Sequence, residues 1–138
     1  MGDWFSKQTL GSLPERAARR WGTREALYFK GRRWSFAELS ARVDRLARGL
    51  IGLGVAPGDK VALWMVNRPE FIETMFAVLK IGAILVAVNT RLRTDDVAYI
   101  LGQSDSSVLA QTFCVYSLNS GTFLRRSPWA SAVDMPVP

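Results

Sequence analysis

Two short apolar runs, each followed by a helical pattern, restrict most strongly how this chain can fold. They are VALWMV at residues 61–66 and AILVAV at residues 83–88. Continuously apolar strands are typical of sheets that are buried on both faces, and a helix between two such strands is typical of a parallel βαβ unit. We therefore predict an α/β fold with a parallel, helix-covered sheet, whose third strand is SVLA at residues 107–110.

Start and stop signals for helices separate these strands. SFAE at residues 35–38 is a capping box, and leucine and valine at three- and four-residue steps predict an amphipathic helix that Gly54 ends. Pro69 begins a second predicted helix, which stops at Gly82. The segment TDDVAYILGQS at residues 94–104 predicts a third helix.

The part before the capping box predicts a helix and a small β-hairpin. Ser12 is the expected N-cap of a helix that runs to Trp21 and ends at Gly22. The segments ALYF at 26–29 and RRWS at 32–35, with Lys30 and Gly31 between them, are typical of a hairpin.

Composition excludes several classes of function. The chain has no histidine and a single cysteine, Cys114, which rules out a histidine-based triad, the usual zinc sites and a disulfide scaffold. No apolar run approaches the roughly 20 residues of a membrane span, so a cytoplasmic protein without a transmembrane segment is expected.

The net charge of +6 arises from 18 basic and 12 acidic residues that are interspersed along the chain. Arginines recur at helical spacing, which predicts solvated helix faces rather than the concentrated basic stripe of a nucleic-acid-binding protein. The arginines with this spacing are Arg16, Arg19, Arg20, Arg42, Arg45 and Arg48.

The segment NTRLR at residues 89–93 is the candidate binding site. It follows an apolar strand, and ligands of open α/β sheets bind outside the carboxyl ends of the strands. A guanidinium there can bind a phosphate with two hydrogen bonds. The alternative is that Arg91 and Arg93 are loop charges that pair with Asp95 and Asp96.

Arg68 follows the preceding strand in a similar way, although Pro69 and Glu70 already account for this segment as a helix start. The residues do not supply a general base, a nucleophile and an oxyanion hole together, so we predict no catalytic residue and no metal ligand.

The composition changes near Gln111. Three of the six prolines lie after this point, and the sequence there shows almost no helical or strand periodicity. Residues 111–138 are therefore expected to form an irregular or disordered tail that follows a domain at residues 1–110.

The order of the motifs resembles the amino-terminal part of the AMP-forming adenylating enzymes, which include acyl-CoA synthetases. The similar segments are WSFAEL at 34–39, LKIGA at 79–83, NTRLR, and VAYILGQSDSSVLA at 97–110. The sequence NTRLR resembles the corresponding segment of the acid–CoA ligase branch. Members of this branch use Mg-ATP to activate a carboxylate as an acyl-adenylate and then transfer the acyl group to CoA.

This resemblance implies a role for one arginine. In some aryl-acid ligases, the arginine at the position of Arg91 faces the CoA nucleotide. The family's phosphate loop, magnesium segment and catalytic lysine do not occur in the sequence, so the chain is expected to be an inactive amino-terminal fragment, truncated or frame-shifted near Gln111. A fatty or related hydrophobic acid is the expected substrate of the complete enzyme.

Two other classes of function stay open. One is a non-catalytic interaction module whose exposed sheet edges need a partner chain. The other is a small Rossmann-like nucleotide binder, which the absence of a G-x-G-x-x-G motif after either apolar strand disfavours.

Overall fold

The computed structural model describes residues 8–111, 114–117 and 123–124. An amino-terminal unit of short elements precedes an α/β layer. The amino-terminal elements are η1 (Leu10–Ser12), α1 (Leu13–Trp21), β1 (Glu25–Phe29) and β2 (Arg32–Ser35). The layer is formed by α2 (Phe36–Gly52), β3 (Lys60–Trp64), α3 (Pro69–Lys80), β4 (Ile84–Ala87), α4 (Thr94–Ser104) and β5 (Ser106–Gln111).

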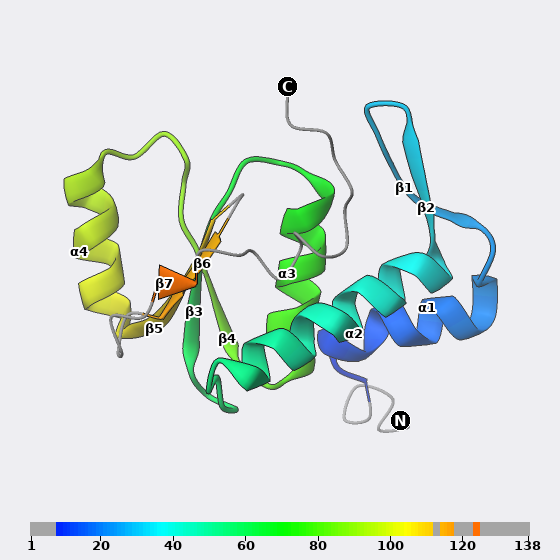
Figure 1. The fold of residues 1–138 in the computed structure, drawn as a ribbon, viewed down its shortest axis with the longest axis horizontal. Coiled ribbons are helices and arrows are strands. Elements are labelled where there is room, and N and C mark those ends of the chain that lie inside the picture. The colour runs from blue at the N-terminus through cyan, green and yellow to red at the C-terminus, as the bar shows by residue number, and fades with distance from the viewer. Residues whose placement is uncertain (1–7, 112–113, 118–122, 125–138) are drawn as a thin grey trace, which may run out of the picture.

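The predicted parallel sheet is confirmed. The strand β3 lies between β4 and β5 and pairs with both in parallel, as βαβ connections require. The helices α2 and α3 cover one face of the sheet and α4 covers the other (Figure 1). The α/β fold class that the apolar runs predicted is therefore correct.

Alternate residues of β3 face the two helical layers, because successive side chains of a strand point to opposite faces. Val61 and Leu63 belong to the main core cluster with α2 and α3, and Ala62 belongs to a smaller cluster with Val97 of α4. All three β3 residues are fully buried, which explains why this strand has no polar alternation in the sequence.

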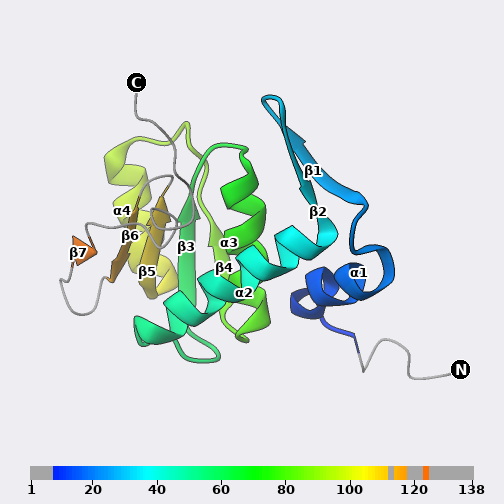
Figure 2. The same cartoon turned by 45° about the vertical axis from the view of Figure 1, so that its right-hand side comes forward.

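The small hairpin is also confirmed. The strands β1 and β2 are antiparallel, and Lys30 and Gly31 join them with φ values of 48° and 84°. Two consecutive residues at positive φ are typical of the tight turn that suits the twist of a two-stranded hairpin. Figure 2 shows the hairpin standing apart from the main sheet, beside the start of α2.

The capping box at the start of α2 is present as predicted. The Glu38 amide donates to Ser35 Oγ at 3.2 Å, and the Ser35 amide donates to Glu38 Oε2 at 2.7 Å. These hydrogen bonds with Ser35 hold the pKa of the Glu38 carboxyl below its ordinary value.

The role predicted for Ser12 is wrong in part. It does precede α1, but its side chain accepts no hydrogen bond from the helix; its Oγ donates instead to the Thr9 carbonyl at 2.7 Å. The turn η1 places Ser12 in a helical conformation, which turns the hydroxyl away from the first-turn amides of α1.

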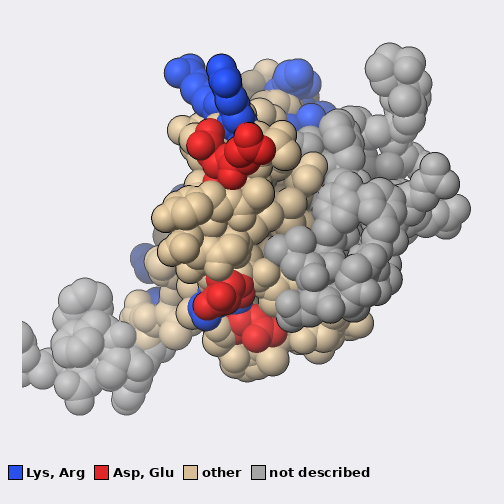
Figure 3. All heavy atoms as spheres, turned by 90° about the vertical axis from the view of Figure 1, so that its left-hand side faces the viewer, with Lys and Arg blue, Asp and Glu red and all other residues tan. Residues whose placement is uncertain are grey.

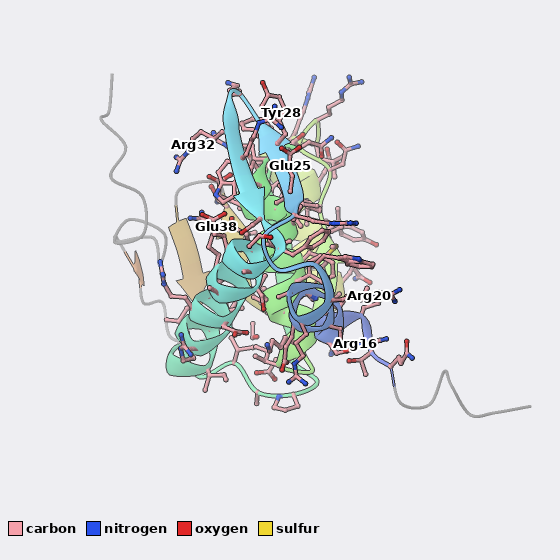
Figure 4. The ribbon with its side chains drawn as sticks, turned by 90° about the vertical axis from the view of Figure 1, so that its right-hand side faces the viewer. Arg16, Arg20, Glu25, Tyr28, Arg32 and Glu38 are labelled. Carbon is pink, nitrogen blue, oxygen red and sulfur yellow. The ribbon has the colours of Figure 1, made fainter. Side chains whose placement is uncertain are left out.

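The expectation of solvated arginine faces holds for α1 but not throughout α2. Figure 4 shows Arg16 and Arg20 on the outer side of α1. Arg42 of α2, in contrast, is largely buried, and its Nε lies 2.5 Å from Oε1 of Glu73 on α3. Helical spacing could not reveal the burial of Arg42, because its partner Glu73 lies 31 residues further along the chain, on another helix.

The sheet continues beyond β5 into the segment for which we expected an irregular tail. The strand β6 (Cys114–Ser117) pairs antiparallel with β5, and β7 (Phe123–Leu124) pairs antiparallel with β6. The other residues of that tail, 112–113, 118–122 and 125–138, lie outside the described part of the chain. Within the described part, no helix is long and apolar enough to cross a membrane.

Candidate functional site

The loop that joins β4 to α4 contains the predicted site residues. The last buried residue before it is Val88, whose amide donates to the Leu63 carbonyl of β3 at 3.0 Å. Because β3 and β4 are parallel, this loop and the β3–α3 loop leave the sheet at the same edge. The structure therefore places the loop where α/β sheets bind their ligands.

Asn89 closes a tight turn at the start of this loop. Its side-chain Oδ1 accepts a hydrogen bond from the Arg91 amide at 2.9 Å, and its carbonyl accepts one from the Leu92 amide at 3.2 Å. An asparagine whose side chain binds the amide two residues later is a recurrent device for fixing a turn. The backbone of Arg91 is thus held from the residue that follows the strand.

The other end of the loop is held by the first turn of α4. Asp96 Oδ2 accepts a hydrogen bond from the Arg93 amide at 3.2 Å, and the Val97 amide donates to the Arg93 carbonyl at 3.0 Å. Asp95 and Asp96 both lie in the first turn, where negative charge interacts favourably with the helix dipole. These acidic residues are therefore accounted for by helix capping.

Arg91 and Arg93 are both exposed, and the structure does not show the ion pairs of the alternative interpretation. Among the described residues, no carboxylate lies within 4.0 Å of either guanidinium. Figure 3, which looks onto the α4 side, shows basic side chains projecting at one end of this face and acidic ones beneath them. In the described structure the arginines are available to an outside anion.

Arg68, in the β3–α3 loop, has local contacts instead. Its Nε lies 3.4 Å from Glu70 Oε2, and its guanidinium carbon lies 6.0 Å from the centre of the Phe29 ring. These contacts agree with a role in the helix start.

Beside Arg68 is a cavity of about 300 Å³ between β1 and the beginning of α3. Its lining residues are Leu27, Tyr28, Phe29, Asn67, Arg68, Pro69, Phe71 and Ile72.

Trp64, at the carboxyl end of β3, is a feature that the sequence analysis did not single out. Its indole Nε1 is buried and has no hydrogen-bond partner in the described structure. The ring packs with Leu92 against the smaller core cluster, beneath the β4–α4 loop. Only the tertiary structure shows the missing acceptor, since a tryptophan in an apolar run is otherwise an ordinary packing residue.

The described residues offer no group of three or more His, Cys, Asp or Glu side chains that could hold a metal ion.

Comparisons with known proteins match most of the chain. The AMP-binding enzyme family matches residues 14–125, beyond residue 110, where the sequence motifs had suggested that the resemblance ends. Feruloyl-CoA synthase of Amycolatopsis is 42% identical over 122 residues, which cover 86% of this chain and 25% of that protein. Crotonobetaine/carnitine–CoA ligase of Salmonella enteritidis is 36% identical, with 84% of this chain and 23% of that protein covered.

Solved structures of similar fold include chains much longer than this one. The fatty acyl CoA synthetase of Mycobacterium tuberculosis superposes with a TM-score of 0.71 at 34% identity, covering 75% of this chain and 21% of that chain. The amino-terminal subdomain of Klebsiella oxytoca NpsA, bound to 3-hydroxyanthranilyl-AMSN, gives 0.72 at 27% identity, covering 75% and 27%.

The fold thus resembles the amino-terminal subdomain or domain of larger proteins. The chain belongs to the AMP-binding enzyme family, and its relatives include acyl-CoA synthetases and ligases. It spans about a quarter of the length of the curated relatives that it matches.

Proposed function

We propose that this chain is the amino-terminal part of an ATP-dependent carboxylic acid–CoA ligase. The complete enzyme converts an acid, ATP and CoA into acyl-CoA, AMP and pyrophosphate through an acyl-adenylate. The proposal is supported by the family match and by relatives that are named as CoA synthases and ligases.

The observation that carries the proposal for this chain's own residues is the exposed guanidinium of Arg91. It follows a parallel strand, lies on a turn that Asn89 closes, and has no carboxylate partner among the described residues. A phosphate of the CoA nucleotide is the kind of anion that such an arginine binds. Arg91 is therefore the proposed CoA contact in the complete ligase, and no such role is assigned to Arg93, which is the N-cap residue of α4.

A fatty or related hydrophobic acid is the proposed substrate of the complete enzyme, with ATP, magnesium and CoA as the other reactants. Support comes from relatives that are named as feruloyl-CoA synthase and fatty acyl CoA synthetase, since both names denote largely apolar acids.

The test of Arg91 uses a chimaera in which residues 8–111 replace the matching segment of the feruloyl-CoA synthase. Arg91→Ala should raise the apparent KM for CoA by the equivalent of about 1–3 kcal/mol, the range for a lost charge-assisted hydrogen bond. Acid-dependent ATP–pyrophosphate exchange, which needs no CoA, should stay nearly unchanged. Arg93→Ala is the matched control and should alter neither reaction.

Equal losses in both half-reactions of the Arg91→Ala chimaera would show that the side chain is structural. An unchanged KM for CoA would remove Arg91 from the binding site.

We also propose that this chain by itself does not catalyse the adenylation of an acid. Adenylation depends on electrostatic stabilisation of the ATP α-phosphate, which the carboxylate attacks as pyrophosphate leaves, and the family uses a lysine and magnesium for this. The purified chain, supplied with a panel of fatty and aryl acids, should release no pyrophosphate in an acid-dependent manner. Sustained release with any of these acids contradicts the proposed incompleteness.

A shifted reading frame is our proposed explanation for the composition break in the last part of the chain. The family match continues to residue 125, which favours a break later than residue 111. The nucleotide sequence in all three frames checks this proposal. A family-like phosphate loop in another frame is the expected result, and a continuous family-like frame in the present reading would oppose it.

One observation favours a non-catalytic interaction module as the second candidate. The strand β4 is the last strand at one edge of the described sheet, and its first residue, Ile84, is half exposed. An unpaired apolar edge is a site at which another chain can add a strand. A partner that binds this edge would be the function of such a module.

A further inference from the structure

Among the described residues, the side chain of Asn89 makes one hydrogen bond, which closes a turn. Asn89 is exposed, and the hydrogen bond recorded for its side chain is the one that Oδ1 accepts from the Arg91 amide. The nearest residues of the smaller core cluster are the buried Val88 before it and the partly buried Leu92 after it. Three residues therefore bridge two anchored positions, and Arg91 is the last of the three.

Val88 and Leu92 fix the two ends of the loop, so the turn between them sets the direction of the Arg91 side chain. Val88 is held by its hydrogen bond to the Leu63 carbonyl, and Leu92 packs against the smaller core cluster. The Arg91 guanidinium has no described ion pair that could orient it from its own end. A long side chain without a partner samples many rotamers, so the backbone conformation at Arg91 determines which region its guanidinium reaches.

We propose that Asn89 is a positioning residue for anion binding by Arg91. Its carboxamide fixes the Arg91 backbone through the 2.9 Å hydrogen bond and aims the guanidinium outward from the carboxyl edge of the sheet. The ligand is the phosphorylated end of a nucleotide such as CoA. The inference rests on the proposed contact between Arg91 and CoA, and it adds a residue whose own side chain does not touch the ligand.

The first measurement follows hydrogen exchange of the Arg91 amide by NMR in the full chain. Asn89→Ala removes the acceptor, so exchange at Arg91 should accelerate by about fivefold, the equivalent of one typical hydrogen bond. Asn89→Ser should restore part of the protection, because a serine hydroxyl can accept from the amide two residues later. Asn67→Ala is the matched control: Asn67 is an exposed asparagine that follows the neighbouring strand β3.

The second measurement titrates the same variants with adenosine 3′,5′-bisphosphate, which carries the phosphates of the CoA nucleotide. The Arg91 resonances of the wild-type chain should shift saturably at low salt. Asn89→Ala should weaken this binding by about three- to tenfold, the effect expected for one lost hydrogen bond of the turn. Asn89→Ser should weaken it less, and Asn67→Ala should leave it unchanged.

The two readouts separate the failure of the inference from the failure of the proposed function. No saturable shift in the wild-type chain, or an unchanged shift in Arg91→Ala, overturns nucleotide binding by Arg91 in this chain, while the KM for CoA of the chimaera tests the contact in the complete ligase. A loss of binding in Arg91→Ala without a loss in Asn89→Ala overturns the positioning role. Unchanged exchange of the Arg91 amide in Asn89→Ala would show that the Asn89 side chain does not hold this turn.

Discussion

Single residues form the hydrogen bonds at the start of α2 and in the loop that carries the candidate anion contact. Ser35 and Glu38 exchange hydrogen bonds across the first turn of α2, while Asn89 accepts from the Arg91 amide and Asp96 accepts from the Arg93 amide. All of these contacts span two or three residues. Such local bonds are within reach of sequence motifs, because the partners are always neighbours in the chain.

The capping box should make the stability of the chain depend on pH through Glu38. Its pKa in the folded chain is lowered from 4.5, so its contribution is fully present above that value and is lost as the pH falls through the folded-state pKa. Glu38→Gln keeps a hydrogen-bonding group but cannot titrate. The wild-type chain should lose stability relative to Glu38→Gln below about pH 4.5.

Urea denaturation of both proteins between pH 3 and pH 7 measures this difference. Ser35→Ala provides the comparison for the cap itself and should lower stability by about 1 kcal/mol at neutral pH. Parallel pH profiles for the wild type and Glu38→Gln would show that the carboxyl does not contribute to this linkage.

At the scale of elements, the helical layer is joined by charges as well as by apolar contacts. Glu73 of α3 is 1% exposed and lies against Arg42 of α2; burial raises the pKa of its carboxyl, and the guanidinium opposes that rise. Lys80 at the end of α3 reaches Asp44 of α2 and, at 3.6 Å, Glu15 of α1. The three helices therefore meet through ion pairs that no single helix shows in its own sequence.

Breaking the buried pair from one side should be more harmful than replacing both of its members. Arg42→Ala leaves a buried carboxyl without its partner and should reduce the free energy of unfolding by about 3–5 kcal/mol. The double variant Arg42→Met/Glu73→Leu, which replaces the pair with apolar groups, should lose much less. Chemical denaturation of the single and double variants checks this, and additive losses would show that the two side chains do not interact.

Close contact between η1 and α3 gives a second prediction at this scale. A Cβ built on Gly11 would lie 2.5 Å from the Leu79 carbonyl oxygen and 2.6 Å from the Lys80 Cα, both of them backbone atoms. Gly11→Ala should therefore destabilise the chain by about 1–3 kcal/mol, since the backbone must move.

Gly102 within α4 offers the matched control, because nothing lies within 4 Å of a Cβ at that position. Gly102→Ala should stabilise the chain by about 0.5–1 kcal/mol through helix propensity. Thermal melting distinguishes the two variants, and a neutral Gly11→Ala would show that the turn η1 is free to shift.

For the whole molecule, the described sheet ends at β4 with an apolar edge. We expect the isolated chain to associate through this strand in a concentration-dependent manner, and Ile84→Lys should suppress the association because charged residues protect sheet edges. Ile51→Lys alters another exposed isoleucine, on α2, and should not affect it. Light scattering after size exclusion measures the outcome; a wild-type chain that stays monomeric opposes this expectation.

Local patterns determined much of this protein. Continuous apolar runs specified β3 and β4, glycines and prolines marked the helix ends, and the Ser35 box marked the start of α2, because each of these signals acts between near neighbours. The same patterns placed Arg91 after a parallel strand. Contacts between distant segments decided what the patterns could not express. Such contacts buried Arg42 against Glu73, paired β6 with β5, and left the Trp64 indole without an acceptor among the described residues, since burial and partner choice arise only when the elements pack together.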